Sequence, residues 1–83
     1  MVQVEIIGPD CQRIHQMVND LLDVAAVSSI PIDVTRITDP VDVLRRGIHS
    51  VPLVVFNGEP AGKGGRLLSR TDLLSLLTDA DQG

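Results

Sequence analysis

The only cysteine of the chain, Cys11, stands where a thiol would gain reactivity. A β-branched run ends at Gly8-Pro9 just before it, and apolar residues with helical spacing follow it. We therefore expect Cys11 at the start of a helix. There the free backbone N–H groups and the helix dipole favour the thiolate, which is the attacking species in exchange with disulfides. The neighbouring charges act in opposite directions, since Arg13 would support a thiolate and Asp10 would oppose it.

Two histidines could join this thiol. His15 follows Cys11 on the expected helix and can share its face, where it could pair with a thiolate or contribute a metal ligand. His49 comes later in the chain and could approach as a third group. A closed metal site usually needs about four ligands, so no metal site is assigned, and a metal or cluster carrier is the weakest alternative. Solvated surface histidines are the more ordinary interpretation of both.

No second cysteine is present to complete an internal disulfide. The residue three positions after Cys11 is Ile14. A mixed disulfide on Cys11 could therefore be released only by an outside thiol such as glutathione. Oxidation could also link two chains through Cys11, so the protein is expected as a monomer or a Cys11-linked dimer. An internal dithiol–disulfide cycle is excluded.

The sequence pattern predicts seven elements, which position these groups. Hydrophobic periodicity separates strands from helices, and capping residues and turn residues set their ends. The expected elements are a strand at Val2–Ile7, a helix from Cys11 capped by Asp10 and fading near Ser28, a strand at Ile32–Ile37, a helix from Asp39-Pro40 to Gly47, a strand at Val51–Phe56, a returning strand at Glu59–Lys63, and a helix after the capping box Ser69–Asp72 that runs past Leu77. Residues 79–83 are expected to form a frayed tail.

The order β-α-β-α-β-β-α predicts one α/β domain over residues 1–83, with a four-stranded mixed sheet and three helices. The first two strands are joined by a helix and should be parallel. Asn57-Gly58 predicts a tight hairpin between the last two strands, and Pro60 places the returning strand at an edge of the sheet.

Three segments in this order resemble the thioredoxin superfamily, in particular its small glutaredoxin-like thioredoxins. Residues 8–11 stand where that family has its redox loop, residues 50–52 resemble its cis-proline segment, and residues 64–69 resemble the glycine turn before its last helix. The resemblance extends from Val2 to about Leu77. It implies a thioredoxin-like fold in which Pro52 is cis and lies beside Cys11, and in which the backbone of Val51 is open to an extended peptide or glutathione.

One departure from that family divides the functional predictions. The family motif is Cys-x-x-Cys, whereas Ile14 occupies the second cysteine position here. The first prediction is a monothiol redox protein that carries out glutathione-dependent thiol–disulfide exchange through Cys11, with Val51 and Pro52 binding the substrate. The alternative is a redox-inactive thioredoxin-like module that binds a protein partner. Neither needs a cofactor, although glutathione could serve as co-substrate.

Composition narrows the possible partners. The net charge is −4, the seven Lys and Arg residues are scattered, and Phe56 is the only aromatic residue, which argues against nucleic-acid binding. No apolar run approaches the roughly 20 residues of a membrane span, and the start of the chain lacks the pattern of a signal peptide. We therefore expect a cytoplasmic protein that acts on a protein thiol, a protein disulfide or glutathione.

Overall fold

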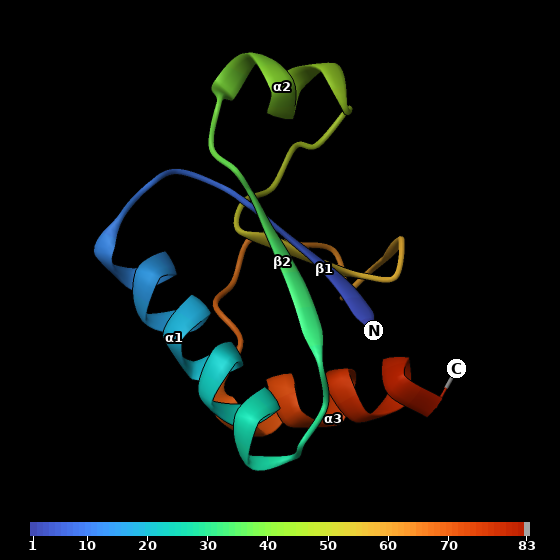
Figure 1. Ribbon diagram of the computed structural model, residues 1–83. Helices are drawn as coiled ribbons and strands as arrows, with labels where there is room; N and C mark the ends of the chain where they lie inside the picture. Colours follow the sequence, from blue (N-terminus) through green and yellow to red (C-terminus); the bar gives the residue numbers. More distant parts are fainter. Residues whose placement is uncertain (83) are drawn as a thin grey trace.

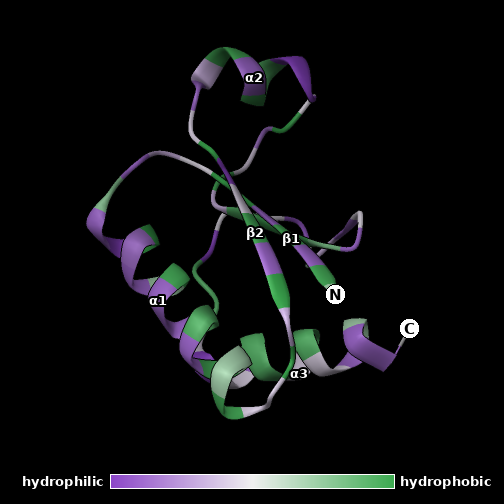
Figure 2. Ribbon diagram, viewed as in Figure 1, coloured by the Kyte–Doolittle hydropathy of each residue, from purple (hydrophilic) through white to green (hydrophobic). Residues whose placement is uncertain are grey.

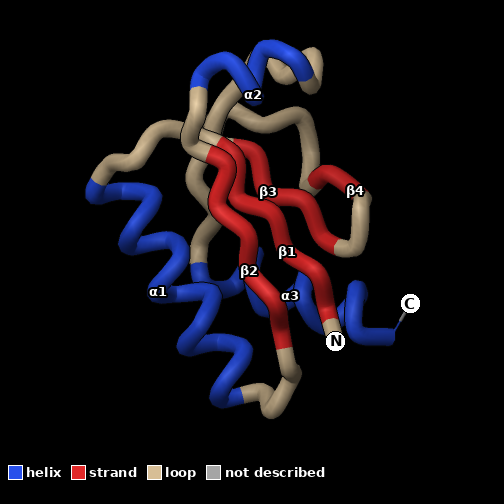
Figure 3. Tube along the Cα trace, turned by 45° about the horizontal axis from the view of Figure 1, so that its top comes forward, coloured by secondary structure: helices blue, strands red, loops and turns tan. Residues whose placement is uncertain are grey.

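The computed structural model describes residues 1–82 as four strands and three helices (Figures 1 and 3). In chain order they are β1 (Val2–Ile7), α1 (Gln12–Val27), β2 (Ile32–Ile37), α2 (Pro40–Arg45), β3 (Leu53–Phe56), β4 (Glu59–Pro60) and α3 (Arg70–Gln82). This is the predicted element order. No helix within the described residues is long and apolar enough to cross a lipid bilayer.

The sheet has the strand order β2-β1-β3-β4, so β1 lies at its centre. Strands β1 and β2 are parallel, in a register that pairs Ile7 with Ile37, whereas β3 is antiparallel to β1 and pairs Leu53 with Ile7. The predicted mixed four-stranded sheet is therefore confirmed. The carboxyl ends of β1 and β2 and the start of β3 meet at one edge of the sheet. We call this the thiol edge, because the loop that carries Cys11 leaves β1 there.

One face of the sheet is covered by α1 and α3, and the main core lies between them (Figure 3). The inward positions of β1 are fully buried aliphatic side chains that pack on the apolar stripe of each helix, which is the green side of α1 and α3 in Figure 2. The main core comprises Val2, Val4, Ile6, Ile14, Met17, Leu21, Val24, Ala25, Val54, Phe56, Leu68, Leu73 and Leu77. A smaller cluster of Ile7, Ile37 and Val55 lies on the other face, where Val43, Ile48 and Leu53 pack against it.

Helix α1 begins one residue later than predicted, and its N-cap is Cys11 rather than Asp10. The side chain of Asp10 hydrogen-bonds His15 instead of the free N–H groups of the first turn. The helix ends at Val27, and Ser29 takes a positive φ of 56° before the chain enters β2. Pairing of the Asp10 carboxylate with His15 has therefore displaced the expected cap.

Both strands of the hairpin are shorter than predicted. The Asn57-Gly58 turn is confirmed, since both residues have positive φ, at 51° and 84°, as this turn requires. Strand β3 begins at Leu53 rather than Val51, and β4 ends at Pro60. Proline has no N–H for further pairing, and Gly62 turns the chain away at a φ of 77°.

Helix α3 starts with the predicted capping box and continues beyond its predicted end. The Asp72 carboxylate accepts from Ser69 N at 3.3 Å, and the Ser69 hydroxyl accepts from Asp72 N at 3.2 Å. The helix extends to Gln82, so the frayed tail expected from Asp79 is wrong as far as Gln82, and Gly83 lies outside the described residues.

One side chain ties α3 to α1. The Arg70 guanidinium lies 2.5 Å from the Asp23 carboxylate and 3.5 Å from that of Asp20. The hydrogen bond to Asp23 is the main cause that raises the pKa of Arg70. These ion pairs hold the first residue of α3 against the middle of α1.

Candidate functional site

Cys11 is exposed at the thiol edge, on the residue that caps α1. Its backbone is extended, with φ −132° and ψ 166°, and its side chain makes no capping hydrogen bond. The backbone itself is held, since Cys11 N donates to Pro9 O at 3.1 Å and Cys11 O accepts from His15 N at 3.0 Å. A fixed backbone thus presents an exposed thiol, as a nucleophile that attacks a large disulfide requires.

The proline segment packs directly against the loop that carries this thiol. The Val51–Pro52 peptide bond is cis. A Cβ atom placed on Gly8 would lie 3.4 Å from the Cα of Pro52 and 2.8 Å from Cδ1 of Ile14. A side chain at residue 8 would therefore require Ile14 to shift, and the absence of one lets the loop lie directly against Pro52. The glycine turn joins the same edge, because Gly65 N donates to Pro52 O at 3.0 Å.

The fold leaves the backbone of Val51 open at this edge. Its side chain is 38% exposed. Within residues 1–82, neither its N–H nor its C=O takes part in a backbone hydrogen bond, because the β3 ladder starts at Leu53. An extended segment could satisfy both groups by pairing with Val51.

Ile14 occupies the position of the missing second cysteine, and it belongs to the core. It is 2% exposed, and its tip lies under Gly8. An apolar side chain thus fills the space behind the loop, and its packing stabilises the loop in place of a second thiol. The sequence pattern had already placed Ile14 on the buried stripe of α1, and that prediction is confirmed.

A charged cluster lies next to the thiol. The Asp10 carboxylate hydrogen-bonds His15 Nε2, and Arg36 Nη2 lies 3.8 Å from the same carboxylate. The hydrogen bond from His15, followed by the charges of His15 and Arg36, holds the pKa of Asp10 below its usual value. Asp10 was expected to oppose a thiolate at Cys11. In the structure, its carboxylate instead hydrogen-bonds the His15 ring and lies near the Arg36 guanidinium.

Arg36 is the residue of this cluster that the sequence interpretation missed. It stands on the inward register of β2, in line with Ile32 and Val34, where the pattern favours an apolar side chain. Its Nε and Nη2 atoms are buried and have no hydrogen-bond partner among the described residues. The signal was present in the sequence, since a charged residue at an inward strand position usually has a partner or a function.

The two histidines do not converge on Cys11 as a ligand set. His15 pairs with Asp10, and His49 lines a groove beside α2. Within residues 1–82, no three His, Cys, Asp or Glu side chains gather closely enough to hold a metal ion.

Two hollows flank the proline segment. On one side lies the α2 groove, of about 440 Å³, which lies between α2 and the segments that border Cys11. Its lining residues are Gly8, Pro9, Thr38, Pro40, Val43, Leu44, Ile48, His49 and Val51.

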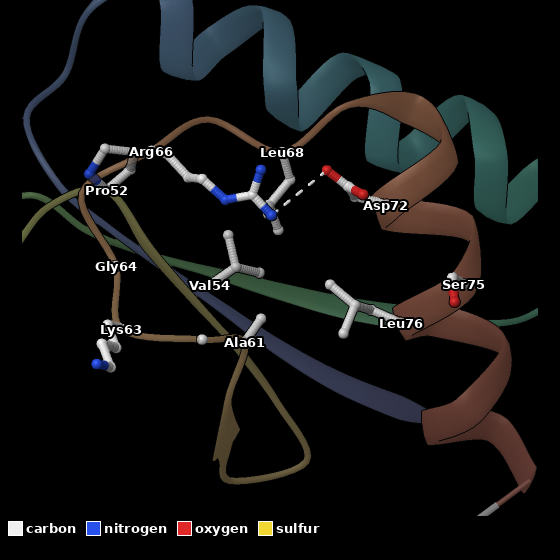
Figure 4. A pocket seen from close by; sticks show the side chains of 11 residues that line it. Pro52, Val54, Ala61, Lys63, Gly64, Arg66, Leu68, Asp72, Ser75 and Leu76 are labelled. Carbon is white, nitrogen blue, oxygen red and sulfur yellow. Dashed lines mark ion pairs between the residues drawn. The ribbon is translucent and has the colours of Figure 1, made fainter.

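On the other side lies a pocket of about 280 Å³ under the glycine turn, with Pro52 at one end and the first turns of α3 at the other (Figure 4). Arg66 crosses its mouth and lies 3.8 Å from Asp72. Lys63 lines the same pocket and points away from this pair (Figure 4).

With this geometry in view, comparison with known proteins identifies the family. The family model described as a thioredoxin domain matches residues 2–78. The chain belongs to this thioredoxin family. No curated protein matches the chain.

Solved structures support the thioredoxin fold. A structure described as that of a malarial protein has a TM-score of 0.67 at 14% identity, with 96% of this chain and 97% of that chain covered. Thioredoxin-2, described as a component of the malaria parasite protein secretion machinery, also has a TM-score of 0.67 at 14% identity, with 95% and 82% covered. At these identities the likeness establishes the fold of this thioredoxin domain and nothing of its substrates.

Proposed function

We propose that this thioredoxin domain is a monothiol exchange protein that uses Cys11 as its nucleophile. The observation that carries the proposal is the exposed thiol at the start of α1, on a loop that packs against Pro52. The open backbone of Val51 beside it supports the binding of an extended disulfide substrate, either glutathione or a segment of a protein.

The proposed reaction needs no group other than an external thiol. The Cys11 thiolate attacks one sulfur of a glutathione–protein disulfide, the Cys11–glutathione bond forms, and the protein thiolate leaves. A thiolate of free glutathione then attacks the sulfur of that glutathionyl group, which releases oxidised glutathione and restores the Cys11 thiolate. In total, one glutathione–protein disulfide and one free glutathione thiol are converted into one protein thiol and one molecule of oxidised glutathione. This cycle requires a reducing thiol pool, so the proposal includes a cytoplasmic location.

The proposal is tested with a glutathionylated peptide and free glutathione. Wild type is expected to accumulate a Cys11–glutathione adduct by mass spectrometry and to release the peptide thiol catalytically. Cys11→Ser should abolish both. A matched control, Cys11→Ser with Gln82→Cys, moves the single thiol to the exposed end of α3 and should react at least about tenfold more slowly. Equal rates for the native and the moved thiol would overturn the proposal.

A second candidate is a protein-binding module without redox turnover. The burial of Ile14 favours it, because the position of the second cysteine in the family motif is occupied here by a side chain that packs in the core. Capture of a partner would then survive Cys11→Ser. Loss of capture in a Cys11→Ser variant that still folds would contradict this candidate.

A further inference from the structure

The first turn of α1 has backbone N–H groups that no side chain caps. Cys11 occupies the N-cap position, and its side chain makes no capping hydrogen bond. Within residues 1–82, no backbone acceptor pairs with the N–H groups of Gln12, Arg13 or Ile14. The side chain of an N-cap residue ordinarily accepts from the second or third of these groups. The Sγ atom of Cys11 therefore stands in the place of that acceptor.

A stronger capping group lies next to this thiol and does not cap the helix. Asp10 directly precedes Cys11, and aspartate is among the best capping residues. Its carboxylate hydrogen-bonds the ring of His15 on α1 and lies 3.8 Å from Arg36 Nη2 on β2. Contacts from two different elements thus engage the carboxylate, and the N–H groups of the first turn are left to the residue that follows it.

Arg36 occupies a strand position where an arginine is unfavourable. It is on the inward register of β2, and its side chain is 27% exposed. Its Nε and Nη2 atoms are buried without a hydrogen-bond partner among the described residues. Burial of such donors is unfavourable, and an apolar side chain would avoid it. Within residues 1–82, the ion-pair partner of this guanidinium is Asp10, so this contact is the one through which it can act.

The direction in which the Asp10 carboxylate turns matters for the thiol. A carboxylate that capped α1 would occupy the N–H groups of the first turn and would place a negative charge beside the Cys11 sulfur. Both effects disfavour a thiolate, because that species gains from free N–H groups and is repelled by a like charge. A carboxylate that is engaged by His15 and Arg36 has neither effect in full.

We propose that Arg36 and His15 are positioning residues for the nucleophile. They hold the Asp10 carboxylate off the first turn of α1, and the Cys11 thiolate receives the N–H groups instead. Arginine stays charged throughout the neutral pH range, so the contact from β2 does not depend on the protonation of His15. The inference rests on the proposed function in taking Cys11 as the nucleophile.

The test measures how fast uncharged iodoacetamide alkylates Cys11 as the pH is raised, because this rate follows the thiolate fraction. Arg36→Met removes the charge and keeps an unbranched side chain. It is expected to slow alkylation about fivefold near pH 7 and to raise the pH of half-maximal rate by about one unit. Arg36→Lys keeps the charge and should recover most of the rate. The urea midpoint of Arg36→Met should not fall, because the variant buries no unpartnered donor.

The same substitution without the carboxylate shows whether Arg36 acts through Asp10. Asp10→Ala removes the competing cap, so this variant should be alkylated at least as fast as wild type. In that background, Arg36→Met should change the rate by less than about twofold. His15→Ala should also slow alkylation when Asp10 is present and not when it is absent. Gln82→Glu lowers the net charge by the same amount at the end of α3 and should leave the rate unchanged.

Three outcomes would overturn the proposal. They are alkylation of Arg36→Met at the wild-type rate, equal slowing by Arg36→Met with and without Asp10, and an Arg36→Met chain that no longer folds. Glutathione turnover is measured on the same preparations. If alkylation depends on Arg36 through Asp10 and no protein turns over glutathione, the exchange proposal fails alone. If wild type turns over glutathione and its alkylation is indifferent to Arg36, the positioning proposal fails alone.

Discussion

At the residue scale, Asp10 connects the loop that carries the thiol to β2. Its carboxylate hydrogen-bonds His15 on α1 and lies 3.8 Å from Arg36 on β2. Because these contacts favour the charged form, the pKa of Asp10 is lower in the folded chain than in the unfolded chain. The folded state then binds fewer protons, so the contribution of Asp10 to stability is present above about pH 4 and is lost as the pH falls through the folded value.

Asp10→Asn is expected to remove this part of the acid sensitivity. Urea midpoints of wild type and variant, measured from about pH 5 to about pH 2, should differ most at the upper end and converge at the lower end. All other carboxylates titrate in both proteins, so the difference isolates Asp10. Asp81→Asn serves as control, because no ion pair within residues 1–82 involves Asp81. A constant difference for Asp10→Asn across this range would contradict the account.

The sequence predicts the positions of single residues better than it predicts their contacts. The place of Cys11 follows from local signals, namely a strand, a turn and an apolar stripe. The pairing of Asp10 could not be foreseen from the same signals, because Arg36 reaches it from another strand and capping competes with that contact. Sequence spacing along α1 places His15 near the thiol and says nothing of which neighbour its ring prefers.

At the element scale, residues 62–65, which lead into the glycine turn, contact the proline segment. Gly64 has a φ of 81°, and a Cβ atom there would lie 2.5 Å from the carbonyl oxygen of Ser50. Gly62 has a similar φ of 77°, but a Cβ atom there would meet nothing within 4 Å. The two positions therefore share a backbone requirement and differ in packing.

Gly64→Ala and Gly62→Ala separate those two effects. Both should lose about 1–2 kcal/mol through the left-handed backbone. Gly64→Ala should lose at least about 1 kcal/mol more, because its methyl group would displace the backbone of Ser50. Urea denaturation measures the free energies of unfolding, and the amide signal of Gly65 reports whether its bond to Pro52 persists. Equal losses in the two variants would show that the turn does not press on Ser50.

The lengths of elements were harder to predict than their existence. The hairpin could be predicted from Asn57-Gly58, because this pair of residues favours a single turn geometry. The extents of β3 and β4 depend on where pairing stops, and Val51 lies beyond the last register pair that β1 can offer. The end of α3 was likewise set by tertiary contact, since Asn57 Nδ2 donates to Ala80 O at 3.3 Å.

At the scale of the whole molecule, topology was predictable and charge distribution was not. The order of strands and helices, with a helix between the first two strands, leaves few arrangements of the sheet. The charges are scattered along the sequence, and only the fold shows which of them pair: Arg36, Arg46, Arg66 and Arg70 lie next to carboxylates, whereas Arg13, in the first turn of α1, takes part in no ion pair within residues 1–82. The net charge of −4 describes the whole chain and does not give the sign of the electrostatic potential beside Cys11.

The sign of the electrostatic potential near Cys11 determines how salt affects the reaction of this thiol with an anionic disulfide. If the average charge of −4 governed the encounter, the chain would repel an anion, and added salt would speed the reaction. Arg13, which is in the first turn of α1 and in no ion pair within residues 1–82, predicts the reverse. The rate with dithiobis(nitrobenzoate), which is anionic, should fall as salt rises to about 0.5 M, while the rate with an uncharged dipyridyl disulfide should change little.

Charge variants complete the argument, because they change the local field without changing the thiol. An Arg13→Gln variant should remove the slowing by salt or reverse it, since it removes the unpaired cation in the first turn of α1. Gln82→Glu makes the chain more acidic at the far end of α3 and should leave the wild-type salt dependence in place. If salt speeds the anionic reaction of wild type, the net charge governs the approach to Cys11, and the thiol edge attracts no anion.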